Sequence, residues 1–301
     1  MATLSYHEQK NIENTKKLRE LQKELPYFCT DFFRGIEAST SVRTRIAYAH
    51  DLKIFFQFLK TANPRTFDNP AHTLTPGDLE KLTVSDLEEY IDYLKCHPSD
   101  TCEDVVNTER GLMRKVSSLR SFYSYFFRNE LIEKNPAALV RMPKLHEKEI
   151  IRLEIDEVAK LLDEVEEGDK LTEKQKLYHE RTKVRDLAMM SLLLGTGIRV
   201  SECVGLDIND IDFKNGGIHI HRKGGKEVTV YFGTEVETAL QDYLDERNDI
   251  IPEEGSENAL FLSLQKKRMN VRSVENLVKK YAKIVTPLKK ITPHKLRSTY
   301  G

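Results

Sequence analysis

The 301-residue sequence contains no long apolar segment. No stretch approaches the roughly 20 consecutive apolar residues that a membrane-spanning helix needs. Its beginning, MATLSYHEQKNIENTKKLRE, lacks the apolar core that a secretion signal requires. We therefore expect a cytoplasmic protein with no membrane partner.

Cysteine is scarce as well, and its spacing does not suit a metal site. The four cysteines are Cys29, Cys96, Cys102 and Cys203, and the segment CHPSDTC is not a CxxC pair. In a reduced cytosol such residues are expected to be free thiols rather than disulfides. We expect neither a structural metal nor a cofactor.

Excess charge of one sign is also missing, because 47 Lys and Arg face 48 Asp and Glu. The charge is segregated along the chain, however. Residues 261–301 hold 11 Lys or Arg against one acid, residues 108–148 hold nine against four, and residues 235–257 hold nine acids against one Arg. Two basic segments suit a phosphate-binding face, which releases counterions when phosphates are neutralised. Solvated lysine-rich helical faces would produce the same pattern.

The first half of the sequence has helical periodicity. Apolar residues recur at helical spacing in two stripes, which are Leu52, Phe55, Phe56 and Leu59, and Leu119, Phe122, Tyr123 and Phe126. Between them, TVSDLEEYIDYL opens with Thr83 or Ser85 as the candidate N-cap of another helix. The pattern predicts a small helical bundle whose aromatic stripes form the core rather than a base-stacking platform.

The second half begins after a charged, proline-containing segment without apolar periodicity, which we interpret as a linker over residues 141–150. Two helices are then predicted, IDEVAKLLDEVEEG and VRDLAMMSLLLGTGI, the second ending at Gly195 and Gly197 with a left-handed cap. The only clear β signal follows, where IHIH and EVTVYF alternate around a Gly-Gly turn. The remainder is helical in pattern, with basic faces.

Three motifs in the second half carry groups that suit phosphodiester chemistry. Arg199 and Glu202 lie in GTGIRVSECVGL, Lys223 lies in the turn RKGGKE, and His294 and Arg297 lie in TPHKLRSTYG. Two guanidiniums can bind the non-bridging oxygens of a phosphate under attack, and so stabilise its transition state. His294 precedes Arg297 by one helical turn, so it can donate to the phosphate or move a proton. Glu202 is expected to hold Arg199 or the histidine in place.

Ordinary surface roles would also account for each residue alone. Arg199 could cap a neighbouring helix, Lys223 and Lys226 could protect an edge strand, and His294 could be a satisfied helix-face histidine. Their joint occurrence, in this order and spacing, favours the catalytic interpretation.

This set resembles the signature of tyrosine site-specific recombinases: an arginine in a TGxRxSE box, a lysine on a β-hairpin, and HxLR. The segments TRIAYAHDLKIFFQFL and SSLRSFYSYFFRNELIEKNPA are similar to the family's core-binding helical domain, so the resemblance runs from about Ser39 to the end. It implies a mainly α fold with a small β-hairpin or sheet. A helical, SAM-like core-binding domain would occupy residues 1–140, and an α-rich catalytic domain would occupy residues 151–301.

The resemblance also implies an activity, in which a tyrosine attacks double-stranded DNA and forms a 3′-phosphotyrosine link. Arg199, Lys223, His294 and Arg297 would be catalytic, with Lys223 as the general acid, and a homo-tetramer would pair two sites. In the family the nucleophile follows HxLR by a few dozen residues, whereas here only Tyr300 follows it. We expect Tyr300 to pack or to touch the DNA backbone. The catalytic domain is then C-terminally truncated, and these 301 residues should bind DNA without cleaving it.

Alternatives to a Xer-like recombinase for chromosome segregation remain. Only about 40 residues precede Thr44, which disfavours an integrase of the lambda type with an arm-binding domain, but other mobile-element integrases stay open. A non-catalytic DNA-binding regulator on the same scaffold fits the lack of a nucleophile. A type IB topoisomerase is disfavoured by the Xer-like first half. A helical module that binds an acidic protein would show little salt-dependent DNA binding.

Overall fold

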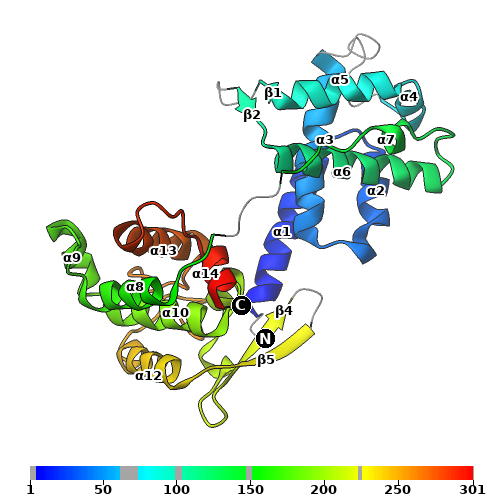
Figure 1. Ribbon diagram of the computed structural model, residues 1–301. Helices are drawn as coiled ribbons and strands as arrows, with labels where there is room; N and C mark the ends of the chain where they lie inside the picture. The colour runs from blue at the N-terminus through cyan, green and yellow to red at the C-terminus, as the bar shows by residue number, and fades with distance from the viewer. Residues whose placement is uncertain (1–4, 62–73, 99–103, 147–150, 223–225, 301) are drawn as a thin grey trace. The chain divides into compact units, whose positions relative to one another are not determined.

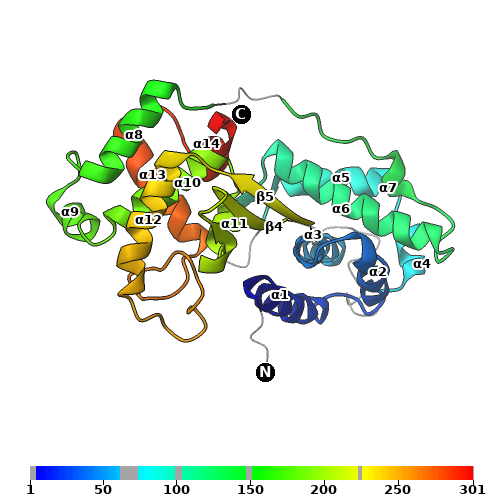
Figure 2. The same ribbon diagram turned by 90° about the horizontal axis from the view of Figure 1, so that it is seen from below.

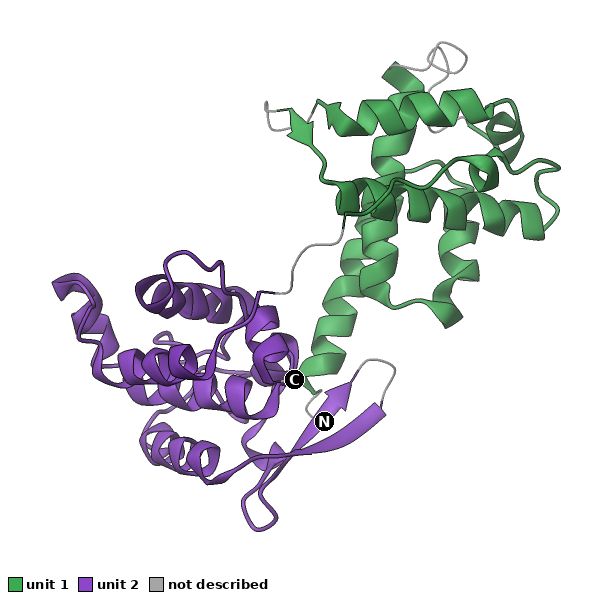
Figure 3. Ribbon diagram, viewed as in Figure 1, with its two compact units in different colours: residues 1–147 green, residues 148–301 purple. Residues whose placement is uncertain are grey.

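A computed structural model describes residues 5–61, 74–98, 104–146, 151–222 and 226–300. The chain divides into two compact units, residues 1–147 and 148–301 (Figure 3). Each unit has its own hydrophobic core.

The described residues of unit 1 form helices and one minimal strand pair. Its elements are α1 (Tyr6–Gln22), α2 (Cys29–Gly35), η1 (Glu37–Ser39), α3 (Val42–Thr61), α4 (Pro76–Glu80), α5 (Val84–Lys95), β1 (Cys96–His97), β2 (Val105–Val106), α6 (Glu109–Arg128) and α7 (Pro136–Leu139). Helix α3 packs against α1, α5 and α6 (Figure 1). The antiparallel pair β1–β2 is too short to give a periodic signal, and the sequence pattern did not predict it.

The two apolar stripes meet in the core of unit 1, as predicted. Every residue of both stripes is buried. The ring of Phe122 contacts those of Phe28, Phe32 and Phe56, at centroid distances between 5.1 and 6.0 Å. Since these rings pack on one another, they are not available to stack on nucleobases.

Of the two candidate N-caps expected for helix α5, Thr83 and Ser85, the structure confirms Thr83. Thr83 is the N-cap of α5, because its side chain accepts a hydrogen bond from the backbone of Asp86, whose carboxylate accepts from Thr83 in return. This reciprocal box satisfies two backbone donors at the helix start.

The first residues of the predicted linker lie on the surface of unit 1. Val140, directly before the linker, is buried in the unit 1 core, and its carbonyl accepts a hydrogen bond from Arg120. His146 bonds through Nδ1 to Glu109 Oε1 of α6 at 2.7 Å. Residues 147–150, the rest of the predicted linker, lie outside the described residues.

Unit 2 combines helices with a small sheet. Its elements are α8 (Ile155–Glu167), α9 (Glu173–His179), α10 (Lys183–Thr196), α11 (Val200–Gly205), η3 (Ile208–Asp210), β3 (Ile211–Asp212), β4 (Gly217–Arg222), β5 (Lys226–Tyr231), α12 (Thr234–Asn248), α13 (Val271–Val285) and α14 (Pro293–Tyr300). Helix α10 is central and packs against α8, α12 and α14 (Figures 1 and 2). Its middle, from Ala188 to Leu194, is buried on all sides, which explains why MMSLLL is apolar around the whole helix.

The predicted hairpin forms two strands of a three-stranded antiparallel sheet ordered β3-β4-β5. Ile218 and Ile220 face the core, while His219 and His221 lie on the exposed face, as alternation requires. The pairing runs to Arg222 opposite Lys226, and the predicted Gly-Gly turn lies outside the described residues. Strand β3 was not predicted, because a two-residue strand has no periodicity to detect.

Candidate active site

The site is organised by the turn between α10 and α11. Gly197 is the C-cap of α10, with φ +59° and ψ 23°, and its N–H donates to the carbonyl of Leu193 at 3.1 Å. The left-handed cap predicted for this helix is therefore confirmed. A side chain at this position would be strained, and its Cβ would also lie 2.7 Å from Cδ1 of Tyr300. Glycine is required here for both reasons.

Arg199 is the N-cap of α11 and is held by Glu202. The carboxylate of Glu202 accepts two hydrogen bonds from Arg199, one from the backbone N–H and one from Nη1, each at 2.7 Å. The Glu202 side chain is only 6% exposed, whereas that of Arg199 is 55% exposed. The carboxylate thus anchors one edge of the guanidinium from below and leaves other donors accessible. Of the two partners expected for Glu202, the structure selects the arginine.

A second arginine approaches the same carboxylate. Nε of Arg222, at the end of β4, lies 3.8 Å from Oε1 of Glu202, within ion-pair range but beyond hydrogen-bond distance. Glu202 therefore links the Arg199 turn to the strand that leads toward Lys223. Lys223 itself lies outside the described residues. Arg222 was not predicted from the sequence, where its only signal is its position directly before that lysine.

Helix α14 brings the third motif to the same turn. Nη1 of Arg297 donates to the carbonyl of Gly197 at 2.6 Å, across 100 residues of sequence. This carbonyl lies at the C-terminal end of α10, where a cation is favoured by the helix dipole. Arg297, rather than Arg199, therefore fills the helix-capping role. His294 is exposed one turn earlier on α14.

Tyr300 packs on the turn, as one of its two expected roles requires. Its ring lies against Gly197, and the residue is 58% exposed. The ring thus closes a small assembly in which α14 rests on the α10–α11 turn through both Arg297 and Tyr300. Leu153, just before α8, joins this assembly because its N–H donates to Thr299 Oγ1 at 3.1 Å.

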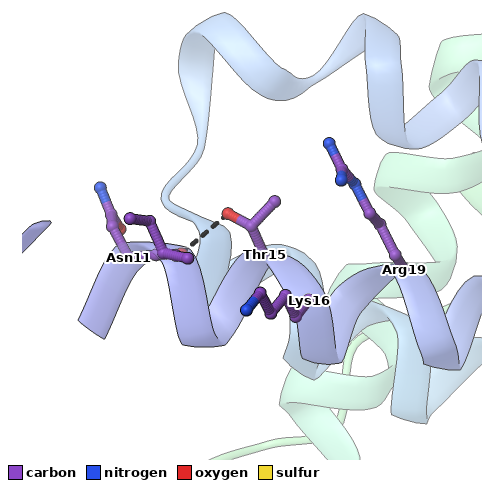
Figure 4. Close-up of a pocket in the computed structure, with 5 residues that line it drawn as sticks. Asn11, Thr15, Lys16 and Arg19 are labelled. Atoms are coloured by element: carbon purple, nitrogen blue, oxygen red, sulfur yellow. Dashed lines mark hydrogen bonds between the residues drawn. The ribbon is translucent and has the colours of Figure 1, made fainter. Parts of the chain in front are cut away.

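Other kinds of site find no comparable support. A surface pocket on unit 1 is lined by Asn11, Ile12, Thr15, Lys16 and Arg19, all on α1 (Figure 4). Its threonine hydroxyl is already bonded to the Asn11 carbonyl at 2.8 Å, and one helix supplies the whole lining. Within the described ranges, no cluster of His, Cys, Asp or Glu could hold a metal ion. Among the same residues, no helix is long and apolar enough to cross a bilayer.

Comparison with known sequences gives matches over both units. The sequence pattern of the Phage integrase family matches residues 151–301. The tyrosine recombinase XerC of Caldanaerobacter subterraneus subsp. tengcongensis is 35% identical over 279 residues, which cover 89% of this chain and 71% of that protein. The tyrosine recombinase XerS of Streptococcus thermophilus is 30% identical over 310 residues, covering 94% and 85%.

Solved structures share the fold. XerH site-specific recombinase bound to a palindromic difH substrate superposes with a TM-score of 0.61 at 17% identity, over 86% of this chain and 68% of that one. A lambda integrase dimer bound to a COC′ core site gives 0.59 at 18% identity, over 90% and 86%. The predicted fold class, mainly α with a small β-sheet, is therefore confirmed.

Proposed function

Because this chain belongs to the phage integrase family and is a Xer-like tyrosine recombinase, we propose that it takes part in site-specific breaking and rejoining of double-stranded DNA in the cytoplasm. The observation that carries the proposal is the meeting of two motifs at one turn. Arg297 bonds the carbonyl of Gly197, and Arg199 starts the next helix with Glu202 beneath it. Two arginines that meet at one short turn, Arg199 from the turn and Arg297 from α14, suit a single phosphate.

In the proposed reaction, a tyrosine oxygen attacks the phosphorus and the bond from phosphorus to the 5′ oxygen breaks. Arg199 and Arg297 bind the non-bridging oxygens, whose charge grows in the transition state. Lys223 gives a proton to the departing 5′ oxygen, and His294 donates to the phosphate or moves a proton. The resulting 3′-phosphotyrosine link preserves the bond energy, so the 5′ hydroxyl of a partner strand can reverse the step.

We further propose that the two parts of the chain act together on DNA. Residues 1–140 form the core-binding domain, residues 141–150 the linker and residues 151–301 the catalytic domain. Two domains clamp one half-site, and four protomers pair two sites. This proposal is supported by the relatives, which match across both parts.

Tyr300 is not the nucleophile in this proposal. Its ring is packed on Gly197, and it shares α14 with Arg297, so turning its oxygen toward a phosphate held by that arginine would disrupt the packing. These 301 residues accordingly bind DNA without cleaving it. A non-catalytic regulator on the recombinase scaffold would share this property, and the same site would serve chromosome dimer resolution or the integration of a mobile element.

Covalent capture tests the proposal. A nicked suicide duplex traps the 3′-phosphotyrosine adduct, because the short 5′ product diffuses away. The 301-residue chain should shift duplex DNA in a salt-dependent manner and form no adduct, whereas a version extended past Gly301 to include a downstream tyrosine should form it. An adduct on the 301-residue chain would show that Tyr300 or another of its tyrosines attacks. Selection of bound duplexes from a random pool would then identify the target and separate the two biological roles.

A further inference from the structure

A buried carboxylate in unit 1 holds a surface arginine where α3 crosses α6. Asp51 of α3 is 2% exposed, and Oδ2 accepts a hydrogen bond from Nη1 of Arg114 on α6. The Arg114 side chain is 47% exposed. The pair is therefore asymmetric, with its anion in the core and its cation at the surface.

A second cation, which is buried, acts on the same carboxylate. Lys115 is buried, and its Nζ donates to Oδ1 of Asn107 at 2.7 Å. Burial raises the pKa of Asp51, while the charges of Arg114 and Lys115 act in the opposite direction. Lys115 can balance the buried charge from within, so Arg114 is not needed solely as a counterion.

Further cations act on the residue next to Asp51. His50, next to Asp51 on α3, is exposed, and its pKa is lowered by partial burial and by the charge of Lys17 on α1. Lys17 is exposed as well. Lys53 and Glu24 also act on His50, and these two form an ion pair at 2.8 Å. Arg114 and Lys115 of α6 thus act on Asp51, and Lys17 of α1 acts on the neighbouring His50, so this part of α3 carries a local excess of positive charge.

We infer that Arg114 contacts a DNA backbone phosphate and that Asp51 is the positioning residue that aims its guanidinium. The inference rests on the proposed DNA-binding function and names one of its contacts. One edge of the planar fork is held by Asp51, so the remaining N–H donors point outward with little freedom to lose on binding. A phosphate oxygen accepts such donors in a fixed geometry, and the contact sets the register of the protein on the duplex.

The experiment uses a charge-neutral double variant. Asp51→Asn with Arg114→Gln leaves the net charge unchanged, so an effect on DNA binding cannot come from overall charge. The matched control is Asp31→Asn with Arg34→Gln, which alters an Asp–Arg pair on α2 whose partners are both exposed and 3.6 Å apart. Affinity for a mixed-sequence duplex is measured over a series of KCl concentrations, and melting curves verify that each variant is folded.

The double variant should bind about tenfold more weakly, equivalent to about 1.4 kcal/mol. Its log–log salt slope should fall by about 0.9, which is the value for one lost phosphate contact. The control pair should match the wild type in both quantities. Equal salt slopes for the double variant, the control and the wild type would overturn the inference. The Asp51–Arg114 pair would then serve only to join α3 to α6. A wild type without salt-dependent binding would instead overturn the proposed function itself.

Asp51→Asn alone tests the positioning role by the sign of its effect. It removes a negative charge, so charge counting predicts tighter DNA binding, whereas a loosened guanidinium predicts weaker binding. Tighter or unchanged binding would remove Asp51 from the proposal. If the double variant does not fold, Arg114→Gln alone, in which the charge of Lys115 still acts on Asp51, decides the phosphate contact by the same change in slope.

Discussion

Replacing Gly197 with alanine should destabilise unit 2 by two separable effects. The left-handed backbone at φ +59° costs an L residue about 1 kcal/mol. The new Cβ would also lie 2.7 Å from the Tyr300 ring, and overpacking of this kind costs about 1–3 kcal/mol. We therefore expect a total loss of about 2–4 kcal/mol in the free energy of unfolding.

Gly255 provides the matched control in the same unit. Its φ is +80°, but a Cβ there would meet nothing within 4 Å, so Gly255→Ala should lose only the backbone contribution of about 1 kcal/mol. Adding Tyr300→Ala to Gly197→Ala should recover about 1 kcal/mol or more, because the ring that clashes is gone. Adding Tyr300→Phe should recover nothing, since the phenyl ring remains.

Native-state hydrogen exchange at the buried amides of α10 measures these free energies within unit 2. Exchange is preferable to fluorescence here, because the chain contains no tryptophan. Equal losses for Gly197→Ala and Gly255→Ala would refute the packing of Tyr300 on the turn. Additive effects of Gly197→Ala and Tyr300→Ala would do the same.

Three further predictions concern the proposed reaction and the thiols. Arg199→Lys should largely retain DNA binding but slow cleavage about a hundredfold in a version that carries a nucleophile, because the bidentate fork is lost; cleavage at the wild-type rate would remove Arg199 from its role. Glu202→Gln should cost about 2 kcal/mol of transition-state stabilisation, roughly thirtyfold in single-turnover rate, because a charged anchor becomes neutral; an unchanged rate would mean that Arg199 needs no anchor. Cys96 is exposed and should react readily with a thiol reagent at pH 8. Burial raises the pKa of Cys203 to about 12 and should protect this thiol until the protein unfolds. Rapid modification of Cys203 in the native protein would contradict its burial.

Features that depend on neighbouring residues could be predicted from the sequence. The stripe of Leu52, Phe55 and Phe56 is readable because one helix face repeats every three or four residues, and its burial followed. The cap at Gly197 and the N-cap at Thr83, one of two candidates, were predictable for the same reason, since each is completed within a few residues. The three motifs were recognisable by order and spacing, although the roles of their residues remain proposals.

The partners of the charged groups could not be predicted in the same way. Nothing near Arg297 in the sequence indicates that it bonds the carbonyl of Gly197, because that contact depends on how α14 packs against α10. Similarly, Asp51 and Arg114 are 63 residues apart and meet only because α3 crosses α6.

By itself, therefore, the sequence determined the helices of the two apolar stripes, the hairpin, the motifs and the resemblance to the family. The expectation of helix throughout the last segment was wrong for residues 249–270, which contain no helix. Only the tertiary structure decided that Arg297 caps α10, that Glu202 lies under Arg199 within reach of Arg222, and that a buried aspartate holds Arg114 at the surface. The physical reason is the separation in sequence between the residues that interact. Backbone geometry and i, i+3 or i, i+4 contacts are encoded within one or two turns of chain. An ion pair across two helices exists only once their apolar faces have packed and removed one partner from water.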